Sequence, residues 1–202
     1  GAGATIGPEV TLKDVEVGEG ATVVRTHSEL SVIGPGADVG PYARLRPGTR
    51  LGVKGKIGTF VETKNAQIAD EAKVPHQTYV GDAEIGRGAN IGAGVIFANY
   101  DGVNKSTTVV GDYSFVGSNS VLAAPVVVGD GAYVAAGSTI TGDVSPGDLG
   151  VARGRQRNIR GWVLRKRAGT KVAAAAQKAL DSAAGTPGET PAAREAKESD
   201  GR

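Results

Sequence analysis

Aliphatic residues recur at every sixth position through most of this chain. One run spans residues 33–57, a short second run spans 85–97, and a third spans 110–140. Glycine usually follows the aliphatic residue directly, and a small or β-branched residue stands four positions after it. An ordinary sandwich with glycine-rich turns would not keep a strict period of six, so the pattern favours a solenoid built from six-residue units.

A six-residue unit supplies one short strand and one tight turn, and three units close a triangular coil. Successive coils stack about 4.8 Å apart through ladder hydrogen bonds. The aliphatic side chain points into the prism, and glycine takes turn conformations that a side chain would forbid. The pattern predicts an all-β fold, a left-handed parallel β-helix of hexapeptide repeats, over residues 1–150. The segment before Ser31 fits more loosely and is expected to form an irregular opening coil or two.

The repeat stops after Pro146, and the composition changes. Residues 151–167 are expected to form a basic C-terminal arm, because 153–167 holds seven basic residues and no acid. Residues 168–202 are expected to be an alanine-rich, disordered tail, although the alanine content of its first half favours a helix. Trp162 is the only tryptophan and is set among arginines, so it is expected to dock on a ligand or a partner chain. A simply solvated arm is the alternative.

Two interruptions of the repeat are expected to bulge onto the surface, where solenoid loops often carry function. They lie between Ile57 and Ile85 and between Phe97 and Val110. At about 18 residues per coil, they bring several polar residues toward one groove: Glu62, Lys64, Tyr79 and Lys105.

The only two histidines of the chain are His27 and His76. His76 lies in the first interruption and is a natural general base near neutral pH. A loop histidine without a role is its alternative, and that alternative is favoured for His27. Asn90 and Asn99 have a plain alternative too, since asparagine often only satisfies turn backbone.

Composition excludes several function classes. The net charge of +2 gives no sign of nucleic-acid binding. Without cysteine there is no disulfide framework, thiolate zinc site or thiol nucleophile, and two histidines cannot form a three-histidine zinc site. No run approaches the roughly 20 apolar residues of a membrane span. The chain lacks methionine and opens in mid-pattern, so we expect it to be a fragment of a longer protein.

Residues 1–167 resemble the acetyltransferase half of the bacterial bifunctional N-acetylglucosamine-1-phosphate uridyltransferase/glucosamine-1-phosphate acetyltransferase. The combination of motifs is specific to this family, whereas the repeats alone indicate only the wider hexapeptide acyltransferases. The motifs are RLRPG at 44–48, FVETK at 60–64, H-x-x-Y at 76–79, YVGDAEIG at 79–86, NIGAG at 90–94, NYDGVNK at 99–105 and FVGSN at 115–119.

The resemblance implies a role for individual residues. His76 is expected to be the catalytic base and Glu62 the carboxylate that supports it. The positions that match the sugar-phosphate site are Arg46, Lys64, Tyr79, Asn90 and Lys105. The positions that match the acetyl-coenzyme A site are Ala93, Asn99, Tyr100, Ser118, Ala136, Arg153 and Trp162.

The resemblance also implies a cytoplasmic homotrimer with active sites between subunits. It would acetylate glucosamine-1-phosphate with acetyl-coenzyme A as cosubstrate, for UDP-GlcNAc, peptidoglycan and lipid-linked cell-envelope synthesis. The family's nucleotidyltransferase domain is missing here, so uridyl transfer and its Mg²⁺ are expected only of that domain. A non-catalytic trimerisation scaffold is the alternative in another class, and it would need the repeats but not the His-x-x-Tyr and basic cluster.

Overall fold

The computed structural model describes residues 1–184 of the chain. Its contacts divide the chain into two compact units, Gly1–Gly154 and Arg155–Arg202. Residues 151–154 of the expected basic arm are thus grouped with the solenoid, and residues 155–167 with the second unit.

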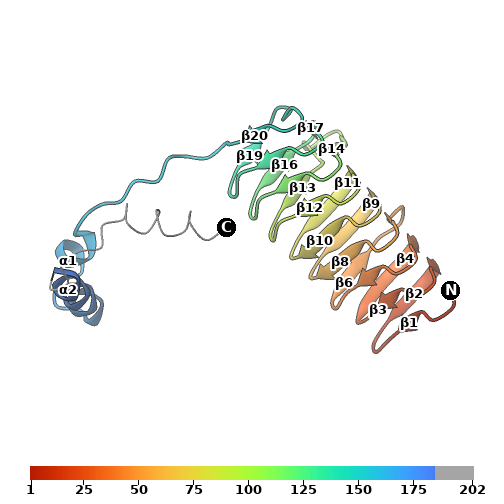
Figure 1. The fold of residues 1–202 in the computed structure, drawn as a ribbon, viewed down its shortest axis with the longest axis horizontal. Helices are drawn as coiled ribbons and strands as arrows, with labels where there is room; N and C mark the ends of the chain where they lie inside the picture. Colours follow the sequence, from red (N-terminus) through yellow and green to blue (C-terminus); the bar gives the residue numbers. More distant parts are fainter. Residues whose placement is uncertain (185–202) are drawn as a thin grey trace, which may run out of the picture. The chain divides into compact units, whose positions relative to one another are not determined.

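Unit 1 is a stack of nine coils, each contributing one strand to a nine-stranded sheet that we call face A (Figure 1). Every strand of this sheet pairs in parallel with its neighbours in the coils before and after it. Its strands are β1 (Thr5–Ile6), β3 (Thr22–Val23), β5 (Asp38–Val39), β8 (Lys56–Thr59), β10 (Lys73–His76), β12 (Asn90–Ile91), β15 (Phe115–Val116), β18 (Tyr133–Val134) and β20 (Leu149–Gly150).

The other two faces of the prism share one 11-stranded sheet, because four long strands bend around their common corner. These are β2 (Thr11–Val17), β4 (Thr26–Ile33), β9 (Glu62–Ile68) and β11 (Tyr79–Ile85). Their first halves form face B1 with β6 (Ala43–Leu45), β13 (Ile96–Ala98), β16 (Val121–Ala123) and β19 (Thr139–Ile140). Their second halves form face B2 with β7 (Arg50–Leu51), β14 (Thr108–Val110) and β17 (Val126–Val128).

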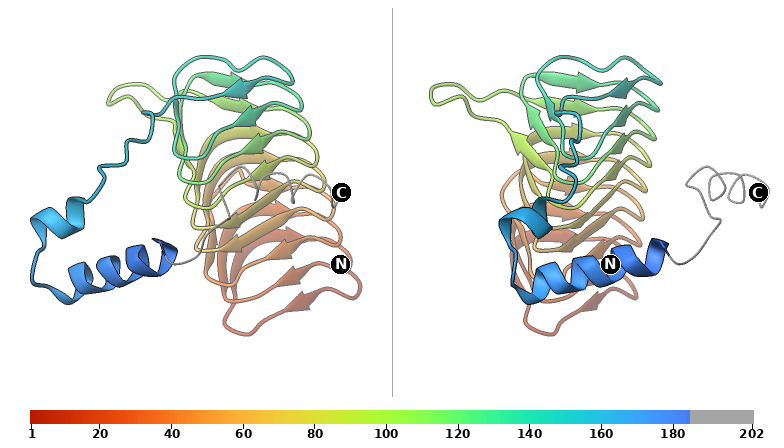
Figure 2. Two further views of the ribbon diagram at one scale, coloured as in Figure 1. Left: turned by 60° about the vertical axis from the view of Figure 1, so that its left-hand side comes forward. Right: turned by 90° about the vertical axis from the view of Figure 1, so that its left-hand side faces the viewer.

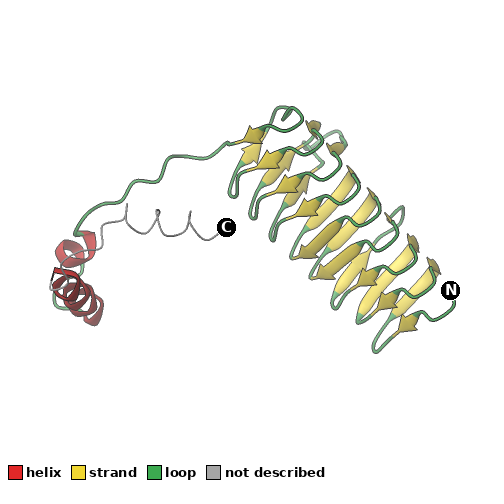
Figure 3. Cartoon of the chain, in the orientation of Figure 1, coloured by secondary structure: helices red, strands yellow, loops and turns green. Residues whose placement is uncertain are grey.

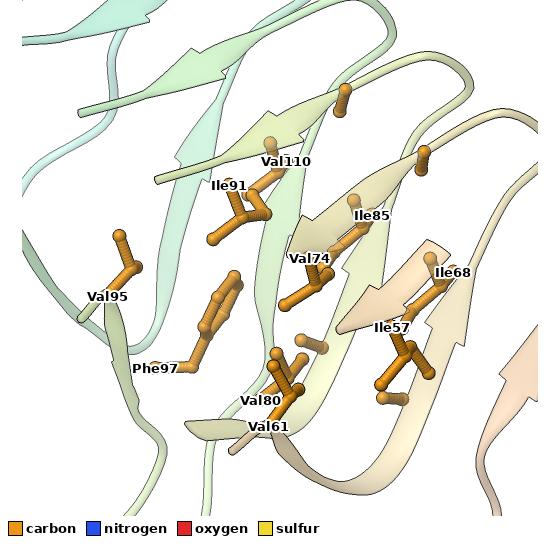
Figure 4. Close-up of a cluster of buried hydrophobic side chains, with 14 of the residues drawn as sticks. Ile57, Val61, Ile68, Val74, Val80, Ile85, Ile91, Val95, Phe97 and Val110 are labelled. Atoms are coloured by element: carbon orange, nitrogen blue, oxygen red, sulfur yellow. The ribbon is translucent and has the colours of Figure 1, made fainter. Parts of the chain in front are cut away.

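The interior of the prism is a set of stacked aliphatic columns, one per face (Figure 4). On face A, Ile57, Val74 and Ile91 follow one another on successive coils and are fully buried. Small residues occupy the position four places later in the repeat, such as Ala72 and Ala89. The predicted left-handed parallel β-helix is thus confirmed, and its core is the one the six-residue period specifies.

The two interruptions of the repeat have different structures. In the first, Lys56 pairs with Lys73 and Lys73 with Asn90, so these coils are one residue shorter than the coil from Phe115 to Tyr133. Nothing bulges there, because β9 and β11 pair residue by residue. The prediction of a surface loop is wrong for this segment. The six-residue period is blurred here because the corners are shorter, and no residues are inserted.

The second interruption is a true insertion. Phe97 pairs with Leu122 on the next coil, and Val110 pairs with Val128. Leu122 and Val128 are one repeat apart in the sequence, whereas Phe97 and Val110 are more than two repeats apart. The extra residues form a loop between β13 and β14 that extends from the wall of the coil stack (Figure 2).

The opening coils are more regular than expected. β2 pairs with β4 over its whole length, from Thr11 with His27 to Val17 with Ile33. The period looked irregular in the sequence because these coils are shorter than three full repeats and differ from each other in length. Shortened corners again account for the slip.

Unit 2 is helical in its described part, which ends at residue 184 (Figure 3). It contains α1 (Trp162–Lys166) and α2 (Lys171–Ala184). Residues 171–184 were expected to fall in a disordered tail, but their alanine content, which also favoured a helix, prevails here. Residues 185–202 of that expected tail lie outside the described residues.

Candidate active site

Face B1 brings together the polar residues of the first interruption. Arg44, Glu62 and Tyr79 lie in register on successive coils. Two residues further along the chain, Arg46 and Lys64 occupy matching places on neighbouring coils. Three of the residues expected at the sugar-phosphate site, together with Glu62, therefore share one face, on two neighbouring columns.

An ion pair joins the two columns. Arg46 Nη1 donates to Glu62 Oε1 at 3.1 Å, with both side chains about two-fifths exposed. Because a half-exposed ion pair of this kind contributes little to stability, a charged ligand can replace either partner at small cost. The guanidinium of Arg46 is thus available to an anion such as a phosphate.

A buried carboxylate, Asp82, stands at the corner between faces B1 and B2. Its oxygens accept hydrogen bonds from Lys64 Nζ at 3.0 and 3.2 Å and from Asn65 Nδ2 at 3.0 Å. The side-chain amide of Asn99 donates to it as well. Burial raises the pKa of Asp82, but these hydrogen bonds together outweigh burial and hold the pKa below its ordinary value. Asp82 is therefore a stable anion inside the wall of the site.

Tyr79 lies against Gly81, which makes room for its ring. A methyl group at Gly81 would lie 2.5 Å from the Tyr79 hydroxyl oxygen and 2.8 Å from the Asn99 amide nitrogen. The phenol and this amide therefore converge over one glycine. Only a residue without a side chain permits that approach.

The corner between faces A and B1 carries the second group of expected residues. His76 ends β10, and the register of the paired strands places Ala93, Ser118 and Ala136 at the same position on the next three coils. Backbone hydrogen bonds run from each coil to the one before it along this corner, from Gly94 to His76, Asn119 to Ala93 and Gly137 to Ser118. We call His76, Ala93, Ser118 and Ala136 the corner column.

The corner column is accessible along its length. His76, Ser118 and Ala136 are exposed or half-buried, and so is Ala93. The N–H groups of Ala93, Ser118 and Ala136 make no backbone hydrogen bond within the described structure. His76 also borders a shallow pocket of about 300 Å³, which Lys56 lines as well.

His76 and Glu62 are not joined in the single chain. Within residues 1–184 the imidazole makes no hydrogen bond or ion pair, and Glu62 is engaged by Arg46. The structure thus places the expected base at a corner and its expected carboxylate on the adjoining face, without a direct contact.

The inserted loop carries two further expected residues, Tyr100 and Lys105, which pair as an antiparallel bridge. Both are exposed, and the Tyr100 hydroxyl donates to the carbonyl of Gly102 at 2.6 Å. Asp101 Oδ1 accepts from the backbone N–H groups of residues 103 and 104 at 2.8 and 2.7 Å. These backbone hydrogen bonds are the main reason that the pKa of Asp101 lies below its ordinary value. The loop is a hairpin whose tip is held by one carboxylate.

Three expected residues lie away from both groups. Asn90 is on face A and borders a recess with Lys73, near the corner with face B2. Arg153 is exposed at the end of unit 1. Trp162 belongs to α1 of unit 2, where the Arg167 guanidinium lies 4.9 Å from its ring centroid.

The buried hydrogen-bond cluster around Asp82 was not predicted from the sequence, although Asp82 belongs to the motif YVGDAEIG. The useful signal was its separation from Asn65, which equals the length of one shortened coil. Both residues occupy the same corner with positive φ, 46° and 45°. Asparagine and aspartate tolerate that conformation better than most residues. The two corners therefore stack, and their side chains meet.

Metal clusters and membrane-spanning helices are both missing from the described part of the chain. No group of three or more His, Asp or Glu residues within 1–184 is arranged to hold a metal ion. None of the helices in that range is long and apolar enough to cross a membrane.

The chain has clear relatives by sequence. A family model described as Bacterial transferase hexapeptide (six repeats) matches residues 107–142. Proteins named Bifunctional protein GlmU match nearly the whole chain: that of Kineococcus radiotolerans is 58% identical over 93% of it and that of Rhodococcus jostii 60% over 87%. The chain covers only 38% and 35% of these two curated relatives. The resemblance inferred from the motifs is confirmed.

Solved structures with a similar chain course include two acyltransferases. The UDP-N-acetylglucosamine acyltransferase from Campylobacter jejuni has 17% identity and a TM-score of 0.38, covering 88% of this chain and 79% of that chain. The N-acyltransferase AntD from Bacillus cereus has 19% identity and a TM-score of 0.42, covering 77% and 90%. Likenesses this weak add nothing to the case for a function.

Proposed function

Because this chain is related along most of its length to the bifunctional GlmU proteins, we propose that it is an acetyl-coenzyme A-dependent glucosamine-1-phosphate N-acetyltransferase. The product would be N-acetylglucosamine-1-phosphate. The observation that carries the proposal is the corner column, in which an accessible histidine is followed in register by three small residues. This column adjoins a face that presents Arg46 and Lys64.

His76 acts as the general base. A sugar ammonium is not a nucleophile until it loses a proton, and an exposed imidazole without a partner in the described chain can accept one. The freed amine then attacks the thioester carbonyl directly, since a chain without cysteine has no thiol to carry the acetyl group. The C–S bond breaks, the coenzyme A thiolate leaves with the proton that the attacking nitrogen sheds, and His76 returns its own proton to the solvent.

Small residues after His76 leave space for an extended cosubstrate along the corner. Acetyl-coenzyme A would lie against Ala93, Ser118 and Ala136. The Ala93 N–H has no backbone partner in the described structure and stands one coil from His76. It is therefore the donor we assign to the oxyanion that forms at the carbonyl.

Arg46 and Lys64 bind the phosphate of the sugar and so fix the approach of the amine. Lys105 adds a third cation from the inserted loop, and Tyr79 contacts the sugar ring. Gly81 is in register with Lys64 on the neighbouring strand, and the ring of Tyr79 lies against Gly81. Lys64 and Tyr79 are therefore both close to this glycine.

The active site is completed between copies of the chain, in a homotrimer. Asn90 borders a recess on face A near the B2 corner, whereas Arg46 lies on face B1. A single prism separates these positions by the width of a face, about 16 Å for five extended residues, and also by three coils along its axis. Two neighbouring copies would bring such faces together, so this division of the expected residues is the reason for proposing an interfacial site.

The cellular setting follows from the same relationship. The product would serve UDP-GlcNAc formation for peptidoglycan and lipid-linked envelope polymers in the cytoplasm. Uridyl transfer and its Mg²⁺ would belong to the remaining part of the full-length protein, since this chain covers less than two-fifths of the relatives' length.

Replacing His76 tests the proposal. His76→Ala should lower acetyl transfer to glucosamine-1-phosphate by about 10²–10⁴-fold, the usual contribution of a general base, while the oligomer stays intact. The matched control is His27→Ala, because His27 is also exposed but bonds Glu29 at 3.0 Å and lies on face B1, outside the corner column. Near-normal activity of folded His76→Ala protein would refute the assignment. Failure of the unmutated chain to bind acetyl-coenzyme A in calorimetry would point to a scaffold instead.

A further inference from the structure

Asp82 contacts residues of the candidate site. Among the carboxylates of the described chain that do so, it is the most buried. Its side chain is 10% exposed, yet it accepts hydrogen bonds from three side chains. Burying a charged carboxylate costs free energy unless its hydrogen-bond partners compensate for the lost water. A residue that only had to form the turn at this corner would not need that charge. The value of Asp82 therefore lies in what it holds in place.

Two of the three partners have expected roles in the reaction. Lys64 is held on both carboxylate oxygens, at 3.0 and 3.2 Å, and its side chain is only 25% exposed. Asn99 is buried and stands where the inserted loop leaves the coil. The Asn99 carbonyl also accepts from the Ser106 N–H at 2.9 Å, which closes the base of that loop.

We propose that Asp82 is a positioning residue of the sugar-phosphate site, and this inference rests on the function proposed above. Its carboxylate fixes the ammonium of Lys64 on face B1. Through Asn99 it also fixes the base of the loop that carries Lys105. One buried anion thus sets the spacing of two cations that approach the phosphate from different elements.

The charge of Asp82 is part of this role. Its hydrogen bonds keep the pKa below the ordinary value, so it remains an anion at neutral pH. An amide in its place would keep the shape but put an NH2 group where one oxygen stands. Lys64 bonds both oxygens, so in either orientation that NH2 group faces its ammonium, and it also faces the amide of Asn65 or Asn99. These contacts are repulsive, so Lys64 and one of the amides have to move.

Asp82→Asn provides the test, with Asp14→Asn as matched control. Asp14 occupies the same corner with φ of 52°, on the first coil, and is exposed. Asp82→Asn should raise KM for glucosamine-1-phosphate about 10-fold or more, because small displacements of binding groups have effects of this size. Asn99 belongs to the positions expected to bind acetyl-coenzyme A, so KM for that cosubstrate should rise less than KM for the sugar phosphate, and Asp14→Asn should match the unmutated protein in both.

A purely structural Asp82 would give a different result. Asp82→Asn would then lower the melting temperature and the fraction of active protein while leaving both KM values alone, and that outcome would overturn the proposal. So would kinetics identical to those of the unmutated chain.

Hydrogen exchange separates this inference from the proposed function. The amides of residues 99–107 should exchange faster in Asp82→Asn than in Asp14→Asn, since the base of the loop loses its anchor. If the unmutated chain fails to acetylate glucosamine-1-phosphate, the proposed function fails on that measurement alone. Unchanged exchange in the loop would refute the anchoring role whatever the substrate.

Discussion

Gly81 shows how one missing side chain shapes the candidate site. Its backbone φ lies outside the left-handed region, so alanine is compatible with the chain conformation there. The constraint comes from outside the backbone, because the Tyr79 hydroxyl and the Asn99 amide occupy the space of a methyl group. Gly81 is therefore required by its neighbours and not by its turn.

Replacing this glycine should separate activity from stability. Gly81→Ala is expected to lower kcat/KM for the sugar phosphate by about 10-fold or more, because the Tyr79 ring and the Asn99 amide must both shift. Unfolding free energy should fall by about 1–2 kcal/mol, since the displaced groups are side-chain ends. Steady-state kinetics and chemical denaturation measure the two effects.

The matched control for this change is Gly142→Ala. An added methyl there meets no atom within 4 Å, and the backbone conformation is equally permissive. The control should behave as the unmutated protein does in both measurements. Normal kcat/KM for Gly81→Ala would show that Tyr79 and Asn99 do not need their present positions.

At the level of elements, the period of six was sufficient to predict the core but not the polar contacts. Inward positions such as Ile57 and Ile91 are specified by their own repeat units, so they were predictable one at a time. The partners of Asp82 depend on the length of the coil before it. The shortened coil stacks Asp82 on Asn65, whereas a coil of three full repeats would have stacked it on Lys64. A shift of one residue changes which side chains share a corner.

The two interruptions of the repeat also could not be told apart from the sequence. Both looked alike in the sequence, because a shortened corner and an inserted loop blur the period equally. Only strand pairing distinguishes them, and it shows that the strands beginning at Glu62 and Tyr79 belong to the wall. The clustering of candidate residues was therefore predictable from the motifs, while the link from Lys64 through Asp82 to Asn99 was not.

The inserted hairpin should be a separable element. Asp101 accepts two backbone hydrogen bonds at its tip, so Asp101→Ala is expected to loosen the loop and the Lys105 that it carries. KM for glucosamine-1-phosphate should rise a few-fold, while the melting temperature of the coils stays the same, because no residue from 100 to 105 is buried. Kinetics together with thermal unfolding would measure both.

Val103→Ala is the control for the hairpin. Val103 is 83% exposed at the same tip, and its backbone N–H is retained in the variant. An equal rise in KM for both variants would mean that the loop responds to any change, and the capping role of Asp101 would be wrong.

At the scale of the whole solenoid, the candidate residues lie on different sides of one prism. Face B1 carries Arg46 and Glu62, and face A carries Asn90. In a closed symmetric oligomer, every interface joins two different surfaces or one surface to itself. A cyclic trimer would place face B1 of one copy against another face of the next, and so complete a site that the single chain leaves divided.

Mixed oligomers test this division directly. Arg46→Ala and Asn90→Ala are expected to be nearly inactive separately. If each site takes Arg46 from one copy and Asn90 from the next, random reassembly of an equal mixture restores about a quarter of the sites, because a copy of either kind is drawn with equal chance. Mixing Arg46→Ala with Glu62→Ala should restore nothing, since Arg46 and Glu62 bond to each other on one face.

Acetyl transfer after co-refolding measures the recovery. Absence of recovery in the first mixture, with mixed trimers verified by mass, would assign both residues to the same copy and refute the interfacial site.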